Sequence, residues 1–404
     1  MGAIHSILGQ ANALTPDAAL VASNCQRLPG VSFHALDGGG LLFCTASQRL
    51  VGLDAVAGLC WLALEDADPQ ETAVAAMREG WGIAPEVGAE WFVQSLELFR
   101  HSGLLAGGPP NVQSYSARPV QMPIPAPEPD AVEVSLQLLD QNFILRLPPE
   151  LLQHLEVLLR PLWQEPAASC SGHGAVPVHI LRAGERWAVH GRMMQPEPAA
   201  LDELASALEC VLVSEAVNGT AHLVALHAAM LGRDGRAVLL SGASGAGKTT
   251  LACALLHAGW SYGSDELVLL RRGSAALQPL SIPPCVKQEA VEVVARWFPA
   301  LGHSPLHLRY AQRVRFLPLA GLEMEEGVVQ TVLLPHWRAG ATLRIEPVSP
   351  AAGLARLLQE CVHASDTFVQ EDVTDLVRWH EGLRYYALEY GTAAEAVKAV
   401  SMLA

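Results

Sequence analysis

The chain has 404 residues, half of them hydrophobic, and a formal net charge of −15 at pH 7. This length allows roughly two or three domains with their own cores. The acidic balance argues against nucleic acid as the main partner, and no apolar run approaches the length of a membrane span. The eight cysteines include no C-x-x-C pair, so we expect no zinc site, no disulfide framework and a cytoplasmic location.

Residues 1–24 form an N-terminal extension without the basic segment of a secretory signal, and a small module follows over residues 25–106. Short apolar runs predict three strands, and apolar residues at helical spacing predict three helices. The strands are expected at residues 31–35, 41–44 and 49–52, and the helices at 55–64, 69–80 and 86–101. Asp68 and Pro69 suit the N-cap and the first position of the second helix. This pattern indicates a small α+β domain of winged-helix type.

Winged helices often bind DNA, and the charge of this module bears on that reading. Between residues 25 and 105 there are four arginines and no lysine against ten acidic residues, a balance of −6. Such a surface repels a phosphate backbone. We therefore expect the module to bind a peptide.

The module resembles the PqqD-like peptide-recognition domain of ribosomal-peptide biosynthesis, also called the RiPP recognition element. The resemblance covers residues 25–106 and rests on the strands, on "LDAVAGLCWLAL", on the two following helices and on "FRHSGLLAG". It implies that the leader of a precursor peptide adds a strand to the sheet edge and lies against the third helix. The groove is then expected between residues 49–53 and residues 90–100. A plain dimerisation or scaffold module is the alternative.

A proline-rich linker is expected over residues 107–131, where seven prolines lie between positions 109 and 129. An α/β extension follows over residues 132–220. Its strands are expected at 132–139 and 142–147, a helix at 148–163, a hairpin at 176–191, and a long amphipathic helix from 200 to about 218. No chemistry is predicted for this extension.

The stretch "SGASGAGKTT", residues 241–250, fits G-x-x-x-x-G-K-[ST] between an apolar strand at 235–240 and a helical pattern that ends near Gly259. A loop of this kind directs backbone N–H groups at the phosphates of ATP. Lys248 is expected to neutralise the β- and γ-phosphates, and Thr249 to ligate Mg²⁺. The predicted phosphate-binding residues are Gly242, Ala243, Ser244, Gly245, Ala246, Gly247, Lys248, Thr249 and Thr250.

Two further features flank this loop. The adjacent carboxylates Asp265 and Glu266 come 17 residues after Lys248 and precede the apolar run 267–270. His227 lies 21 residues before Lys248. No convincing Walker B pattern of four apolar residues and an aspartate is present, so these carboxylates are the candidates for the chemistry.

This arrangement resembles the HPr kinase/phosphorylase family and its relatives, over about residues 205–290. The resemblance implies an α/β P-loop kinase domain of HPr-kinase type at 132–404, with its core at 221–404 and a histidine-initiated strand leading to the P-loop. It implies Asp265 as the general base, Glu266 as a Mg²⁺ ligand or positioning residue, and His227 as a hydrogen-bond partner of the carboxylates or phosphate. The second carboxylate is Glu rather than Asp, and "QPLSIPPCVKQEAVEVVARWF" replaces the family's glycine-rich signature. In that stretch, Lys287 is expected to contact phosphate or substrate.

A transition-state arginine is also expected, with four candidates: Arg309, Arg313, Arg315 and Arg338. Together, the two resemblances imply a Mg²⁺- and ATP-dependent kinase that binds the leader of a ribosomally made precursor peptide and phosphorylates a core hydroxyl, most simply a serine. Three alternatives stay open: an ATP-binding peptide chaperone, a kinase of an HPr-like protein, and phosphorylation followed by elimination. The sequence leaves a homo-oligomer open.

Overall fold

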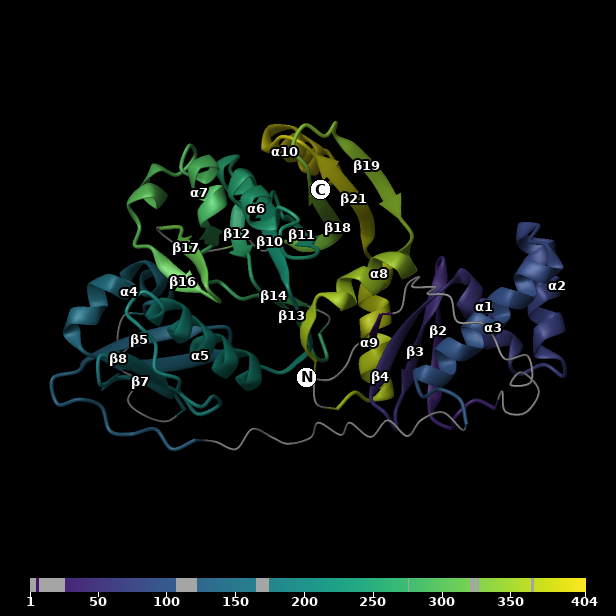
Figure 1. The fold of residues 1–404 in the computed structure, drawn as a ribbon, viewed down its shortest axis with the longest axis horizontal. Helices are drawn as coiled ribbons and strands as arrows, with labels where there is room; N and C mark the ends of the chain where they lie inside the picture. The colour runs from purple at the N-terminus through teal and green to yellow at the C-terminus, as the bar shows by residue number, and fades with distance from the viewer. Residues whose placement is uncertain are drawn as a thin grey trace. The chain divides into compact units, whose positions relative to one another are not determined.

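The computed structural model describes residues 5–6, 26–106, 122–164, 174–274, 276–319, 324, 327–364 and 367–404 (Figure 1). Its contacts divide the chain into two compact units. The first contains Met1–Ser116, Gly273–Ala275 and Pro347–Tyr386, and the second contains Ala117–Arg272, Ala276–Glu346 and Ala387–Ala404. Within the described ranges, every helix is too short or too polar to cross a membrane.

The first unit is built on a four-stranded sheet in the order β1-β4-β3-β2. Its strands are β1 (His5–Ser6), β2 (Val31–Leu36), β3 (Gly39–Cys44) and β4 (Arg49–Asp54), and its first helices are α1 (Ala55–Ala63), α2 (Pro69–Trp81) and α3 (Pro85–His101). The three strands and three helices predicted for this module are thus confirmed, with ends shifted by one or two residues. β1 pairs in parallel with Val51 and Gly52, so residues of the chain itself occupy part of the edge predicted for the leader.

Local chemistry explains where these helices begin and end. Asp54 accepts a hydrogen bond from the Ala57 N–H at 2.8 Å, and Asp68 accepts one from the Glu71 N–H at 3.0 Å. Each carboxylate thereby satisfies one of the unpaired N–H groups of a first helical turn. Trp61 and Phe99 meet edge to face at 5.1 Å between ring centroids, inside the core shared by the helices and the sheet.

The other face of this sheet is covered by a segment from near the end of the chain. α8 (Pro350–Gln359) packs against β4, β3 and β1, and β20 (Cys361–Ala364) and α9 (Gln370–Glu381) follow it. The Phe43 and Phe368 rings lie 6.2 Å apart, and the Phe368 N–H donates to Gln48 at 2.6 Å. Figure 1 shows α8 and α9 on one side of the sheet and α1 and α3 on the other. Residues 347–386 were predicted to belong to the kinase domain, but their contacts group them with the N-terminal module.

The second unit begins with a sheet in the order β5-β6-β7-β8, which shares a core with α4 and α5. These elements are β5 (Val132–Leu138), β6 (Gln141–Leu147), β7 (Val176–Ala183), β8 (Arg186–His190), α4 (Leu152–Leu159, flanked by 3₁₀ turns) and α5 (Leu204–Gly219). Of the predicted linker, residues 107–121 lie outside the described residues. Residues 122–131 run along this unit, where Met122 N–H donates to Arg192 O at 2.8 Å and Pro125 O is bonded to the His179 ring at 2.7 Å.

A six-stranded sheet in the order β12-β10-β11-β18-β21-β19 carries the P-loop. Its strands are β10 (Ala228–Arg233), β11 (Arg236–Ser241), β12 (Ser261–Ser264), β18 (Val328–Trp337), β19 (Arg344–Val348) and β21 (Arg384–Tyr390). α6 (Lys248–His257) packs on β10 and on α10 (Ala393–Leu403), which Thr392 caps. The remaining elements are β9 (His222–Leu226), β13 (Val268–Arg271), β14 (Leu277–Pro279), β15 (Cys285–Lys287), β16 (His307–Arg309), β17 (Gln312–Phe316), α7 (Gln288–Val294) and a 3₁₀ turn (Pro299–His303).

Candidate active site

Strand direction brings three parts of the predicted site, the P-loop, Asp265 and His227, to one edge of the six-stranded sheet. β10 is antiparallel to both β11 and β12, with Ala228 beside Ser241 and Met230 beside Ser264. β11 and β12 therefore end at the edge where β10 begins. The P-loop follows β11 at this edge, Asp265 follows β12, and His227 immediately precedes β10.

Two details of this arrangement differ from the sequence analysis. The strand that His227 initiates is β10, and it reaches the P-loop only through a tight turn and β11. The carboxylate pair also follows a strand, β12, which the sequence analysis did not include. β12 reads Ser-Tyr-Gly-Ser and has little apolar character, but pairing with β10 buries its last three residues. Asp265 thus stands at the end of a strand, as the acid of a Walker B motif does.

The P-loop has the backbone that its glycines allow. Gly245 and Gly247 have φ angles of 88° and 94°, in the left-handed region that other residues rarely adopt. Gly247 is the N-cap of α6, so Lys248 is the first residue of the helix. The Lys248 side chain is 6 % exposed, and its ammonium group donates to Gly242 O and, at 3.4 Å, to Ala243 O. The loop therefore holds its lysine folded over its own backbone.

Groups from distant parts of the chain support the loop. The Trp337 backbone N–H donates to Ala246 O at 3.1 Å, and the Tyr390 hydroxyl donates to Gly247 O at 3.3 Å. A Cβ at Gly247 would lie 2.6 Å from that hydroxyl, so only glycine fits. On the other side Lys287 donates to the Ser244 hydroxyl at 3.1 Å. Lys287 therefore lies at the loop, where the sequence analysis expected a contact with phosphate or substrate.

Asp265 is buried at the loop without a complete set of partners. Its side chain is hydrogen bonded to Thr249, the residue predicted to ligate Mg²⁺. Its Oδ1 atom is buried and has no hydrogen-bond partner among the described residues. Burial raises the pKa of Asp265 to about 7; the neighbouring Glu266 adds to the rise, and Thr249, Lys248 and Arg309 oppose it. A buried carboxylate with a free acceptor oxygen and a pKa near neutrality suits a general base.

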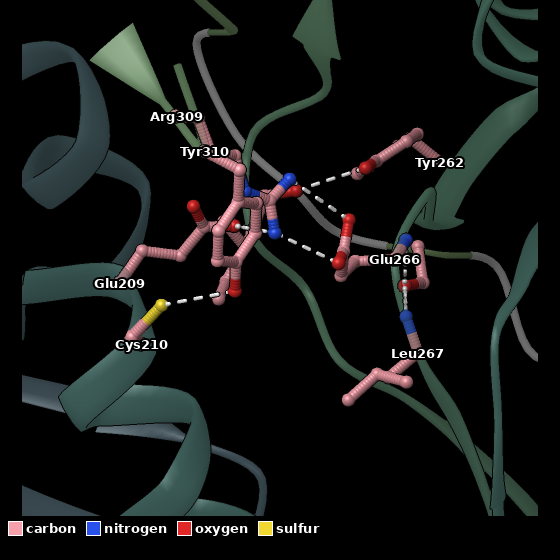
Figure 2. A network of polar contacts seen from close by, with 9 residues as sticks. Glu209, Cys210, Tyr262, Glu266, Leu267, Arg309 and Tyr310 are labelled. Carbon is pink, nitrogen blue, oxygen red and sulfur yellow. Dashed lines mark hydrogen bonds and ion pairs between the residues drawn. The ribbon is translucent and has the colours of Figure 1, made fainter. Parts of the chain in front are cut away.

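Glu266 is held by an arginine, as Figure 2 shows. Arg309 donates through Nη2 to Glu266 Oε1 at 2.8 Å and through Nη1 to Glu266 Oε2 at 3.2 Å, a fork-to-fork pair. Thr249 was predicted as a Mg²⁺ ligand, and Glu266 as a Mg²⁺ ligand or a positioning residue. In the structure Thr249 is bonded to Asp265 and Glu266 to Arg309, and the two Mg²⁺ roles stay predictions.

The contacts of the four candidate arginines distinguish them from one another. Arg309 is bound to Glu266 of the carboxylate pair. Arg315 donates to Ser304 O, Arg338 pairs with Glu389 at 2.6 Å, and Arg313 is exposed on β17. Arg309 is therefore the candidate with a place in the site.

Glu209 was missed, because the sequence analysis found no chemistry in its helix. It lies on α5 with 2 % of its surface exposed, and its Oε1 atom is 3.5 Å from Arg309 Nη2. Burial raises the pKa of Glu209 to about 7, with Arg309 lowering it and Glu266 raising it. The available signal was a pair of glutamates, Glu209 and Glu215, within an otherwise largely apolar helix.

Glu209→Gln is expected to gain stability relative to the parent as the pH rises. A carboxyl whose folded pKa lies above its ordinary value of 4.5 contributes stability at lower pH and loses it as the pH rises to about 7. The glutamine variant lacks this titration, so the difference in free energy of unfolding should move in its favour by at most about 1.4 kcal/mol per pH unit. Urea titrations of both proteins between pH 4.5 and 7 measure this difference. A difference that does not change with pH would contradict the burial of an ionisable Glu209.

The residues at the loop fit a nucleotide with Mg²⁺. The unpartnered Asp265 oxygen, the Thr249 hydroxyl and the lysine-bearing loop together offer the hard oxygen donors and the positive charge that such a ligand needs. Among the described residues, no group of three or more His, Cys, Asp or Glu side chains forms a metal site. Mg²⁺ would accordingly be held by hydroxyl, carboxylate and phosphate oxygens. His227 is half-buried at the same edge, and its predicted role stays a prediction.

Comparisons with protein-family models and with curated proteins do not assign this chain to a family. No protein-family model matches the chain, and a search of curated proteins finds no match.

Proposed function

We propose that this protein is an ATP-dependent kinase that binds the leader of a ribosomally made precursor peptide and phosphorylates a hydroxyl group, most simply a serine, of its core. The observation that carries the proposal is the placement of Asp265. This buried carboxylate has one unpartnered oxygen, touches Thr249, and follows a strand that ends at the same sheet edge as the P-loop.

Phosphoryl transfer depends on positioning and charge neutralisation, and the residues at this edge can supply both. The loop N–H groups and Lys248 bind the phosphates, and the Thr249 hydroxyl supplies a ligand for Mg²⁺. Asp265 accepts the proton of the serine hydroxyl while the serine oxygen forms a bond to the γ-phosphorus and the bond from that phosphorus to ADP breaks. Arg309 and Lys287 bring further positive charge to the same edge.

The N-terminal module supplies the peptide specificity in this proposal. In its sheet β4 lies between β3 and β1, and among the described residues the pairing with β1 covers Val51 and Gly52 of β4. A leader in extended conformation would add to β4 in place of His5–Ser6, and the core would then reach the kinase site at raised effective concentration.

Intact mass of a precursor peptide encoded beside this protein, after incubation with the protein, ATP and Mg²⁺, tests the proposal. A retained phosphate adds about 80 Da. A loss of about 18 Da, that of one water, would indicate phosphorylation followed by elimination. An unchanged mass together with measurable binding of ATP and peptide would indicate a chaperone. Transfer to an HPr-like protein in preference to the peptide would indicate a regulatory kinase.

A core peptide without its leader is expected to be phosphorylated with a kcat/KM roughly 10²- to 10⁴-fold lower than the full precursor, because it loses the avidity of the second binding site. ATP affinity should not change between the two substrates, because the P-loop belongs to the second unit. Steady-state kinetics with both peptides measure this effect. Equal kcat/KM values would remove the peptide-recognition role of the N-terminal module.

A further inference from the structure

Arg309 bridges two carboxylates that come from different elements. Its Nη2 atom lies 2.8 Å from Glu266 Oε1, in the turn between β12 and β13, and 3.5 Å from Glu209 Oε1 on α5. Arg309 is the last residue of β16, and the next two residues, Tyr310 and Ala311, have φ angles of 48° and 62°. Non-glycine residues in this region cost energy and persist where the surroundings hold them. The backbone is therefore turned tightly immediately after the arginine.

Packing does not account for a glutamate at position 209. The side chain is almost fully buried on a helix where leucine, alanine and valine predominate, and a buried charge is costly unless it is fully paired. The pairing is incomplete on both sides. Glu209 Oε2 and Arg309 Nε are buried without hydrogen-bond partners among the described residues. An ion pair kept only for stability is expected to satisfy these atoms.

The geometry instead points to a role for Glu209 in the site. We propose that Glu209 is a positioning residue that holds Arg309 against Glu266 and so fixes the turn that carries Asp265 and Glu266. Figure 2 shows the order of these contacts, from α5 through Arg309 to the turn that carries the carboxylate pair. The inference rests on the proposed kinase activity for its catalytic readout. Glu209 acts through Arg309 and touches neither substrate nor phosphate.

The other charged and titratable groups near this chain of contacts are few. Cys210 and Cys285 lie close to Glu209 and Arg309, and Tyr310 is bonded to Cys210 at 3.6 Å. Around Asp265 are Lys248, Cys253 and Tyr262, in addition to Glu266 and Arg309. Removing the Glu209 carboxyl group leaves Arg309 to Glu266 alone, so the guanidinium group loses the contact that fixes it from α5.

Glu209→Gln is expected to lower kcat roughly 10- to 100-fold, the size typical of a residue that orients another functional side chain. The KM for ATP should change less than about threefold, so the loss should appear in kcat. Arg309→Lys should lower kcat similarly, and the double variant should lose little more than Arg309→Lys alone. Additive losses, or a KM effect without a kcat effect, would overturn the inference.

The matched control is Glu215→Gln on the same helix. Glu215 has a side chain 1 % exposed and pairs with Arg192 rather than Arg309, so its neutralisation should cost stability and leave kcat unchanged. If Glu209→Gln does not fold, Arg309→Lys tests the inference in its place. An unchanged kcat in Arg309→Lys would overturn the inference, because Glu209 is proposed to act through Arg309.

A second measurement separates this inference from the kinase proposal. Unfolding midpoints of Glu209→Gln, Glu266→Gln and the double variant should be non-additive, because both carboxylates bind one guanidinium group. If the parent protein transfers no phosphate, the kinase proposal fails, and non-additive midpoints still support the bridge. If the midpoints are additive while the parent is active, the positioning inference fails and the kinase proposal stands.

Discussion

Asp265→Asn is expected to lower kcat for phosphate transfer roughly 10²- to 10⁴-fold, the contribution of a general base. Asparagine has nearly the shape of aspartate and keeps an oxygen for Thr249, but it cannot accept the proton of the attacking hydroxyl. ATP affinity should therefore stay within a fewfold of the parent value. Single-turnover transfer and equilibrium nucleotide binding, measured on the same preparations, separate the two effects.

Asp372→Asn is the control for neutralising a buried aspartate. Asp372 is 4 % exposed and accepts a hydrogen bond from Val369 N–H at 2.9 Å in the first turn of α9. This variant should lose stability and keep its kcat. A parallel loss of ATP affinity in Asp265→Asn would indicate that Asp265 binds Mg²⁺ rather than accepting the proton. An unchanged kcat would mean that Asp265 takes no part in phosphate transfer.

Lys248→Ala is expected to lower kcat/KM for ATP at least roughly 10²- to 10³-fold, because a preorganised charge at the transferring phosphoryl group is lost from a buried position. The chain has three lysines, at positions 248, 287 and 398, which form a graded series. Lys287→Ala, which removes the contact to Ser244, should cost roughly tenfold or less, the range of one charge-assisted hydrogen bond. Lys398→Ala, on the exposed side of α10, should have no effect.

The order of the three lysines is the informative result. Kinetics at varied ATP and saturating peptide give kcat/KM for each variant. Equal losses at 248 and 398 would mean that the P-loop does not hold the reacting phosphates. A larger loss at 287 than at 248 would move the phosphate site from the loop toward β15.

Short-range chemistry made much of this structure predictable. The helices of the N-terminal module follow from capping residues such as Asp68, whose carboxylate bonds the N–H three residues on. The P-loop follows from glycine at positions with positive φ and from a strand and a helix on either side. Each of these features depends on residues within one or two turns of each other, which a single sequence displays directly.

The remaining features depend on residues that are far apart in the chain. Tyr390 supports Gly247 across 143 positions, and Glu209 reaches Arg309 across a hundred. No local pattern connects such pairs, so loop support and the arginine bridge were not predictable. Strand β12 was not predicted for a related reason: its burial comes from pairing with β10 and not from its own composition. The pairing of Thr249 with Asp265 rather than Glu266 likewise depends on how the turn after β12 directs two adjacent side chains.

The chain crosses between its two units more than once, since residues 347–386 belong to the first unit while their neighbours on both sides belong to the second. The module of residues 25–106 is therefore not expected to fold as an independent domain. Excised alone, it would expose the sheet face that carries Phe43, which Phe368 and α8 cover in the full chain. Exchanging this module between proteins would require moving two separate gene segments together. A single fusion point would leave an exposed apolar sheet face and an aggregation-prone fragment.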